Sequence, residues 1–236
     1  MKIALIGYGK MGKTIEKLAQ HAGHEIVLKL SEKPTHALLR DSKAQVAIEF
    51  TNPESAYKNI LTLLRSNIPT VCGTTGWAQN LPSVLEKVDQ YNGSFIYASN
   101  FSLGVNLFFA IAQNTAKLLK DFDQMYDLSI SETHHTQKKD APSGTAISLA
   151  EKIMLESNYK WWELNGDKKQ RTIPIHAYRE ENVPGTHIIE YKSLIDSIEL
   201  KHTAFSREGF ALGALRAAEY IFDKKGVFTM KDVLGL

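Results

Sequence analysis

The first hundred residues alternate short apolar runs with segments whose apolar side chains recur at helical spacing. An amphipathic helix with Met11 and Ile15 on its apolar face is predicted to end near Gly23, and further helices are predicted from Pro53 and over residues 82–91. Strands that alternate with helices pair in parallel, so this half predicts a doubly wound parallel sheet. The apolar runs predicted as its strands are Lys2–Ile6, Glu25–Leu30, Ala44–Phe50, Ile68–Cys72 and Phe95–Ser99.

The pattern changes after a helix that begins near Gly104. A strand over Asp127–Thr133 and a helix over Gly144–Glu156 lead into three closely spaced strands, predicted over residues 172–178, 186–192 and 197–204. Consecutive strands with short connections favour a mixed or antiparallel sheet. A last helix, Gly209–Phe222, is apolar on one face and is expected to pack back onto the first sheet. We therefore predict an α/β protein of two domains, residues 1–103 plus 207–236 and residues 104–206.

Composition and charge exclude several classes of protein. The 236-residue chain has a net charge of +2, so no electrostatic attraction to nucleic acid or to a membrane surface is expected. No apolar run approaches the roughly 20 residues of a membrane span, and the run before Gly7 is too short for a signal peptide. The single cysteine, Cys72, rules out an internal disulfide and is interpreted as a buried filler. A cytoplasmic location is expected.

A GxGxxG motif follows the first predicted strand at once and opens the first predicted helix. The first glycine permits a tight turn, the second lets the backbone approach a pyrophosphate, and the third lets helix and strand pack closely. An acidic residue, Glu32, lies 20 positions after Gly12, at the end of the second strand, where it can accept hydrogen bonds from ribose hydroxyls. The succession of strand, glycine motif, amphipathic helix, second strand and acidic residue predicts a Rossmann-type dinucleotide-binding domain. The alternative is that the glycines serve only tight turns. The motif residues are Gly7, Tyr8, Gly9, Lys10, Met11 and Gly12.

Three further loops leave the carboxyl ends of the predicted parallel strands, which is where ligands bind in such sheets. We expect them to line the nicotinamide half of NADH or NADPH, although each loop taken singly is also explained by turn chemistry. Glu32 and Lys33 stand side by side near the expected ribose, where one repels and the other attracts a 2′-phosphate, so use of both cofactors is expected. The loop residues are Phe50, Thr51, Gly73, Thr74, Thr75, Ala98, Ser99, Asn100 and Phe101.

Residues 132–145 concentrate the chemistry of the second half. Two adjacent histidines, His134 and His135, end a predicted strand and point to opposite sides, so they make a poor metal chelate, and no metal is expected. Lysines and a Ser-Gly-Thr helix start follow, which favours an anion site in which Gly144 and Thr145 offer backbone N–H groups to a carboxylate. The alternative is a solvated basic loop before an N-capped helix.

The segment resembles the E-x-H-H-x-x-K-x-D-A-P-S-G-T signature of the dihydrodipicolinate reductase family. Further matches run in the family's order over essentially the whole chain: Gly7–Gly12, Gly73–Gly76, Asn100–Asn106 and residues 202–214. The resemblance implies NADH- or NADPH-dependent reduction of 4-hydroxy-tetrahydrodipicolinate, a small cyclic dicarboxylate of the diaminopimelate route to lysine. It also implies a homotetramer formed through the sheet of the second domain, the domain that binds the substrate.

The resemblance also implies roles for single residues. His134 and Lys138 match the catalytic pair, with the lysine as the favoured proton donor, and His135, Lys138, Ser143, Gly144 and Thr145 match the substrate site. The chain departs from the family pattern at Thr136 and Gln137, where many members carry basic residues, and at residues 179–182, which lack a common glycine. Two alternatives stay open: another two-domain NAD(P)-dependent oxidoreductase of amino-acid metabolism, such as an aspartate or homoserine dehydrogenase, and a non-catalytic dinucleotide sensor.

Overall fold

The structure, a computed structural model, describes residues 1–167 and 169–236 and divides them into two compact units. The first unit joins residues 1–103 to residues 208–236, and the second spans residues 104–207. Arg207, which the sequence analysis groups with the first domain, lies in the second unit. Within the described residues, no helix has both the length and the apolar character needed to cross a membrane.

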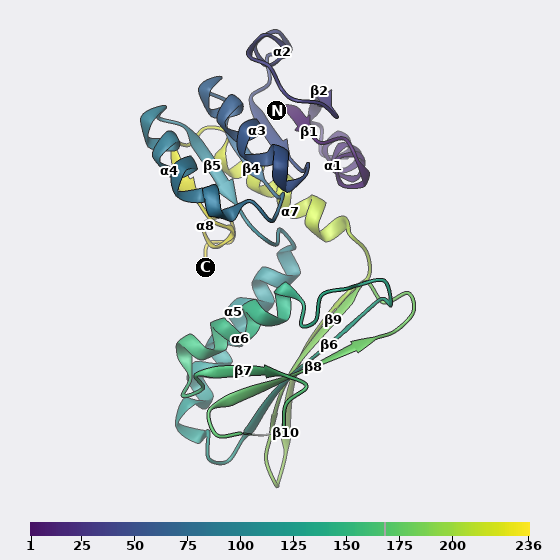
Figure 1. The fold of residues 1–236 in the computed structure, drawn as a ribbon, viewed down its shortest axis with the longest axis vertical. Coiled ribbons are helices and arrows are strands. Elements are labelled where there is room, and N and C mark those ends of the chain that lie inside the picture. Colours follow the sequence, from purple (N-terminus) through teal and green to yellow (C-terminus); the bar gives the residue numbers. More distant parts are fainter. Residues whose placement is uncertain (168) are drawn as a thin grey trace. The chain divides into compact units, whose positions relative to one another are not determined.

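The first unit is a six-stranded parallel sheet in the order β11-β5-β4-β3-β1-β2 (Figure 1). Successive side chains of each strand point to opposite faces of the sheet, and both faces are covered, so the strands are buried on both sides. Ile3 and Leu5 of β1 belong to the apolar cluster that contains α1 and α7, whereas Ala4 and Ile6 belong to the cluster on the other face. The strands are β1 Lys2–Ile6, β2 Glu25–Leu30, β3 Val46–Glu49, β4 Thr70–Cys72, β5 Ser94–Tyr97 and β11 Gly226–Phe228.

Helices cover both faces of this sheet, as expected for a doubly wound fold. The last long helix, α7, packs against α1 and the central strands through a row of small residues that includes Ala211, Ala214 and Ala218, as its apolar face predicts. The helices are α1 Lys10–His21, α2 His36–Ser42, α3 Pro53–Arg65, α4 Leu81–Gln90, α7 Glu208–Ile221 and α8 Met230–Leu234, with a short 3-10 turn at Ala78–Asn80.

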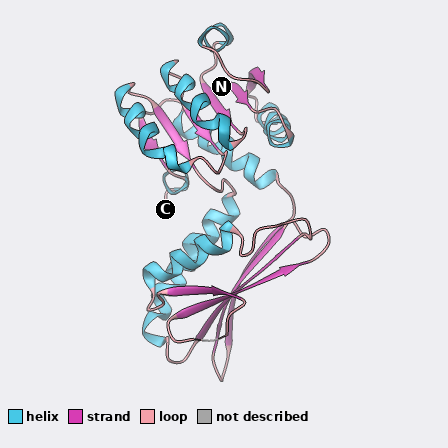
Figure 2. Ribbon diagram, in the orientation of Figure 1, coloured by secondary structure: helices cyan, strands magenta, loops and turns pink. Residues whose placement is uncertain are grey.

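The second unit is a mixed five-stranded sheet in the order β10-β9-β6-β8-β7, with β9 antiparallel to both of its neighbours (Figure 2). Helices α5 and α6 pack on one face, where Phe108 and Leu149 meet Ile130 and Ile189 of the sheet. The elements are α5 Leu103–Leu119, a 3-10 turn at Lys120–Phe122, β6 Asp127–His134, α6 Gly144–Glu156, β7 Trp161–Leu164, β8 Thr172–Arg179, β9 Gly185–Lys192 and β10 Ser197–Ala204.

The predicted fold class is confirmed: a Rossmann-type parallel sheet and a second α+β unit on a mixed sheet. Four short elements carry too weak a pattern to be predicted, namely α2, β7, α8 and β11. The edge strand β11 has only three residues and β7 only four, so neither shows a period. The predicted strand over Phe95–Ser99 ends earlier, at Tyr97, which leaves Ala98 and Ser99 in the loop that follows.

Candidate active site

The GxGxxG motif forms a strand–turn–helix junction in the first unit. Gly7 has a φ of 97°, and a Cβ there would lie 1.9 Å from the carbonyl oxygen of Phe50. A Cβ on Gly12 would lie 2.4 Å from the Gly7 carbonyl oxygen, so the first turn of α1 sits directly on the end of β1. A Cβ on Gly9, in contrast, would meet nothing within 4 Å. The Cα of Gly9 therefore faces open space at the N-terminus of α1, an end of the helix that favours an anion.

The loops after β3, β4 and β5 meet beside this junction. The Thr51 backbone N–H donates to Thr74 Oγ1 at 2.7 Å, and the ring of Phe50 fills the place of a side chain at Gly73. The rings of Phe50 and Phe101 lie 6.1 Å apart between centroids. The structure therefore brings most of the predicted loop residues together, with Thr75 and Ser99 exposed and Asn100 accepting a hydrogen bond from the Ser102 N–H.

A buried carboxylate, Glu49, supports these loops and was not singled out from the sequence. It accepts hydrogen bonds from the Thr51 hydroxyl, from Cys72 Sγ at 3.2 Å and from Asn59 Nδ2 at 3.4 Å. Burial, together with the Glu49 carboxylate, raises the pKa of the Cys72 thiol. Cys72 is thus an unreactive interior residue, as its apolar surroundings predict, but it is a hydrogen-bonding one.

Glu32 and Lys33, the predicted ribose neighbours, are exposed residues in the loop beyond β2. Lys29, on β2, contacts the glycine turn through Tyr8: its Nζ pairs with Glu16 Oε1 at 3.0 Å and lies 5.2 Å from the centre of the Tyr8 ring. The Tyr8 hydroxyl donates to the same carboxylate. Glu16 was also not singled out from the sequence, because a single acid on an amphipathic helix carries no signal of its own.

In the second unit, the buried face of the sheet changes from apolar to polar along β6. Residues 128, 130, 132 and 134 alternate toward the helices, so the row that begins with Leu128 and Ile130 ends with Glu132 and His134. The neighbouring strand β9 does the same, because its register sets His187 beside Glu132. His187 lies 53 residues after His134 in the sequence, and only the pairing of β6 with β9 brings the two imidazoles to 5.1 Å between ring centroids.

Glu132 is the centre of this polar cluster and its side chain is fully buried. Its Oε2 lies 3.4 Å from His134 Nδ1 and 3.6 Å from His187 Nε2, and its Oε1 accepts the Ser143 backbone N–H at 2.9 Å. Burial would raise the pKa of the Glu132 carboxyl, but the nearby His187 imidazole and the hydrogen bond from Ser143 outweigh it and hold the pKa at about 2. Glu132 is therefore ionised at neutral pH.

His134 is buried and neutral at neutral pH. Burial lowers the pKa of its imidazole to about 4, against the opposing attraction of the Glu132 carboxylate. Gly185 leaves the room for the ring, since a Cβ there would come within 3.1 Å of His134 Nε2. A neutral imidazole is not the stronger acid of the predicted catalytic pair, and the proton donor must be sought at the lysine.

Lys138 lies in the loop after β6 and is 22% exposed. Its Nζ bonds both carboxylate oxygens of Asp140, at 2.8 and 2.7 Å. Its backbone N–H donates to the carbonyl of His135 at 3.0 Å, which makes a tight turn of residues 135–138. His135 itself is half-buried, so the two adjacent histidines do differ in environment, as expected for the end of a strand.

The helix α6 begins directly after this loop. Ser143 is its N-cap and accepts the Ala146 N–H on its hydroxyl at 3.1 Å, while the same hydroxyl lies 3.2 Å from His187 Nε2. Gly144 and Thr145 form the first turn, with open space at the Cα of Gly144. The N-terminal end of α6, which favours an anion, is thereby fixed to the Glu132 cluster.

The same cluster includes three metal-ligating side chains. Donor atoms of Glu132, His134 and His187 lie within 4.8 Å of one another, an arrangement that the His134–His135 pair alone did not indicate. The guanidinium of Arg179 stands 3.6 Å from the Glu132 carboxylate, however, and would repel a cation there. The charges therefore favour a hydrogen-bonded network over a metal centre.

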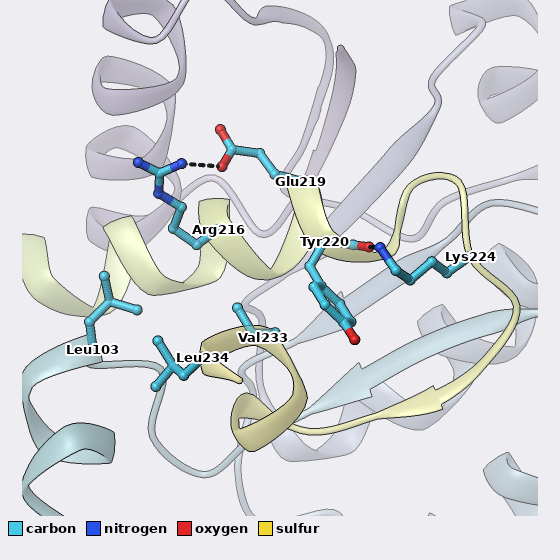
Figure 3. Close-up of a pocket in the computed structure, with 7 residues that line it drawn as sticks. All are labelled: Leu103, Arg216, Glu219, Tyr220, Lys224, Val233 and Leu234. Carbon is cyan, nitrogen blue, oxygen red and sulfur yellow. Dashed lines mark hydrogen bonds and ion pairs between the residues drawn. The ribbon is translucent and has the colours of Figure 1, made fainter. Parts of the chain in front are cut away.

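A cavity of about 540 Å³ lies elsewhere in the first unit, between α7, α8 and the end of the loop at Leu103 (Figure 3). Arg216 and Glu219 pair across its rim at 2.9 Å, and Lys224 lies 4.1 Å from the centre of the Tyr220 ring. None of the predicted site residues lines this cavity.

Comparisons with known proteins match both units. The family model described as "Dihydrodipicolinate reductase, N-terminus" covers residues 1–101, and "Dihydrodipicolinate reductase, C-terminus" covers residues 104–234. A 4-hydroxy-tetrahydrodipicolinate reductase of Christiangramia forsetii is 51% identical over 235 residues, which cover 99% of this chain and 98% of the relative. A relative of the same name from Methanoregula boonei is 33% identical over 258 aligned positions, covering 100% of this chain and 98% of the relative.

Solved structures show the same fold. The dipicolinate-bound dihydrodipicolinate reductase from Paenisporosarcina sp. TG-14 superposes with a TM-score of 0.81 at 23% identity, over 97% of each chain. A probable dehydrogenase from Thermotoga maritima reaches a TM-score of 0.56 at 10% identity, over 99% of this chain and 92% of its own.

Proposed function

The chain belongs to the dihydrodipicolinate reductase family, and from this membership we propose that it reduces 4-hydroxy-tetrahydrodipicolinate to tetrahydrodipicolinate with NADH or NADPH, in the diaminopimelate route to lysine. One observation carries the proposal beyond family membership. Glu132 lies 3.4 Å from His134 Nδ1 and accepts the Ser143 N–H, so it joins an imidazole to the N-terminal end of α6, and Lys138 lies in the loop between the two.

The first unit binds the dinucleotide. Gly7 to Gly12 hold the pyrophosphate, since the Cα of Gly9 faces open space while Gly7 and Gly12 pack against backbone. The loops at residues 50–51, 73–75 and 98–101 line the nicotinamide half, at the carboxyl ends of β3, β4 and β5. Glu32 and Lys33 lie near the adenosine ribose. When bound, the dihydronicotinamide supplies a hydride to the electrophilic ring carbon of the substrate.

The second unit binds the substrate dicarboxylate. Gly144 and Thr145 at the N-terminus of α6 hold one carboxylate, and His135 with Lys138 holds the other. Ser143 does not need to reach the substrate to contribute, because its hydroxyl caps Ala146 and its N–H is held by Glu132. These contacts place the ring and exclude water from its reacting edge.

Lys138 is the proton donor. The 4-hydroxyl group leaves as water, which gives a conjugated ring. Negative charge develops on this ring as hydride arrives, and the Lys138 ammonium supplies the proton there. Asp140 holds this ammonium in the absence of substrate and is exposed enough to release it. His134 stays neutral, beside the negative charge of Glu132, and positions the turn that carries Lys138.

We further propose a cytoplasmic homotetramer, which rests on the family resemblance. Support comes from the β9–β10 hairpin of the second unit, where the apolar side chains of Leu194 and Ile195 are fully or largely exposed and Ile198 is 38% exposed. A cluster of this kind favours burial against another copy of the chain. Light scattering at micromolar concentration is expected to give a mass near four chains, and a fully active monomer would refute the assembly.

A coupled assay tests the function. Substrate is generated enzymatically in place, and the loss of cofactor absorbance is followed for NADH and NADPH in turn. Turnover that depends on the cyclic dicarboxylate supports the reductase. Aspartate semialdehyde, and oxaloacetate together with ammonium, serve as alternative substrates, and oxidation of NADH or NADPH with one of these instead would place the chain among other oxidoreductases.

A further inference from the structure

Arg179 ends β8 and reaches across to the loop that carries Lys138. Its Nη2 donates to the carbonyl of Asp140 at 2.5 Å, and its Nε donates to the carbonyl of Lys138 at 3.3 Å. The same guanidinium stands 3.6 Å from Glu132 Oε1 and donates from Nη1 to the Tyr178 carbonyl at 2.7 Å. A single planar group thus contacts two backbone carbonyls of the loop and the buried carboxylate below it.

The sheet sets the position of this side chain. β6 and β8 are parallel, and their register sets Arg179 beside His134, with the Glu180 N–H donating to the His134 carbonyl at 2.9 Å. Neighbouring residues in register point to the same face, so Arg179 joins the polar row of Glu132 and His134. The side chain is 22% exposed, which leaves its contacts with the loop partly shielded from water.

We propose that Arg179 is a positioning residue that holds the Lys138 loop in the shape needed for proton donation, with Glu132 anchoring the guanidinium. The proposal rests on the proposed function, because it assigns Arg179 to the proton-transfer step of that reaction. It also gives a role to Arg179, the first residue of the segment 179–182 in which the chain departs from the family pattern.

Arginine suits this task for a geometric reason. The guanidinium offers five N–H donors in a rigid plane, so it can bond carbonyls on either side of residue 139 at once and still face the carboxylate. An ammonium at position 179 carries its three donors on a single nitrogen, so it cannot occupy the separate positions from which Nε and Nη2 bond the two carbonyls. Arg179→Lys is therefore expected to behave much like Arg179→Ala, although it keeps the charge.

The experiment compares Arg179→Ala and Arg179→Lys with Arg40→Ala, an exposed arginine of the first unit that bonds its neighbour Asp41. We expect kcat to fall at least about tenfold in both Arg179 variants, with the NADH dissociation constant within about twofold of the unmodified protein. Guanidinium ion added at millimolar concentration is expected to restore part of the kcat of Arg179→Ala, but none in Lys138→Ala. Arg40→Ala should match the unmodified protein.

Hydrogen exchange gives a readout that does not depend on activity. The Lys138 N–H donates to the His135 carbonyl, and Arg179→Ala is expected to speed exchange of this amide while the α6 amides keep their protection. If the unmodified protein shows no turnover, the proposed function fails, while the exchange result still tests whether Arg179 holds the Lys138 loop. Unchanged exchange, unchanged kcat, or a lost kcat that guanidinium does not restore would each overturn the role of Arg179.

Discussion

Glu132 Oε1 accepts the backbone N–H of Ser143 at 2.9 Å, which joins the buried end of β6 to the N-cap residue of α6. The bond has a structural consequence for both sides of the site. His134 lies two residues beyond Glu132 on the strand, and the helix end at Gly144 follows Ser143 directly. The imidazole and the anion-binding turn are therefore held in one hydrogen-bonded assembly before any substrate arrives, which reduces the ordering cost of binding.

Replacing the proton donor is expected to reduce turnover without affecting the cofactor. Lys138→Ala should lower kcat by about 100-fold or more, since general acid catalysis contributes on that order. NADH affinity should hardly change, because Lys138 belongs to the second unit. Steady-state kinetics and NADH titration measure the two effects. Lys139→Ala, an exposed neighbour, is the matched control, and near-normal turnover in Lys138→Ala would remove the lysine from its assigned role.

The buried imidazole of His134 is expected to make the fold sensitive to acid. Its pKa is lowered from 6.5 to about 4, so below about pH 6.5 the unfolded chain binds a proton that the folded chain excludes. The free energy of unfolding should therefore fall as the pH drops from about 6.5 to about 4, by up to about 1.4 kcal/mol per pH unit for one such group.

Urea unfolding of the unmodified protein and of His134→Asn at several pH values measures this difference. His202, whose pKa burial also lowers, contributes in the same direction to both proteins and cancels in the comparison. The stabilisation contributed by the ionised Glu132 carboxylate is lost only at lower pH, between 4.5 and about 2. A variant with the same slope as the unmodified protein from pH 6.5 to 4 would show that His134 titrates normally.

The N-terminus of α6 is expected to bind planar dicarboxylates that mimic the product. Pyridine-2,6-dicarboxylate should inhibit competitively against the substrate, because it presents two carboxylates on a planar ring as the product does and one of them can bind the helix end. Thr145→Pro removes one backbone N–H at a helix position that tolerates proline, and it should raise the inhibition constant. Thr145→Ala keeps the backbone N–H, so it measures the effect of losing the hydroxyl alone on the inhibition constant. Inhibition that competes only with NADH would locate the compound in the first unit instead.

The protein is expected to use both NADH and NADPH, with kcat/KM values that lie within about tenfold of each other, or roughly 1.4 kcal/mol. Glu32 favours the ribose hydroxyls of NADH and Lys33 the phosphate of NADPH, and both are exposed beyond the end of β2. Glu32→Ala should shift the ratio toward NADPH, and Lys33→Ala toward NADH. A preference above about 100-fold in the unmodified protein would point to another residue. Lys29 is the first to examine, since it already pairs with Glu16.

Local patterns were enough to predict the central elements of both units. The run Lys2–Ile6, the glycine turn and the apolar face of α1 each specify their structure within a few residues, and the observed bounds agree closely. The short edge elements were not predictable in this way. β11 owes its existence to its pairing with β5, and Trp161–Leu164 becomes a strand because β8 lies beside it.

The site shows the same division between local and long-range information. The family signature indicated His134 and Lys138, and the helix start at Ser143 was readable from its sequence. His187 and Arg179 were not assigned roles, because they enter the cluster through the register of β9 and β8 against β6. Asp140 was not assigned a role either, although its carboxylate is the hydrogen-bond partner of the Lys138 ammonium.

Transfer of a labelled hydride tests the proposed reduction most directly. NADH stereospecifically deuterated at C4 is supplied in the coupled reaction, once with each face labelled, and the ring product is analysed by mass spectrometry. We predict that one of the two labelled cofactors gives a product heavier by one deuterium and that the other gives unlabelled product. Oxidation of both cofactors with no deuterium in the product would contradict direct hydride transfer to the cyclic dicarboxylate.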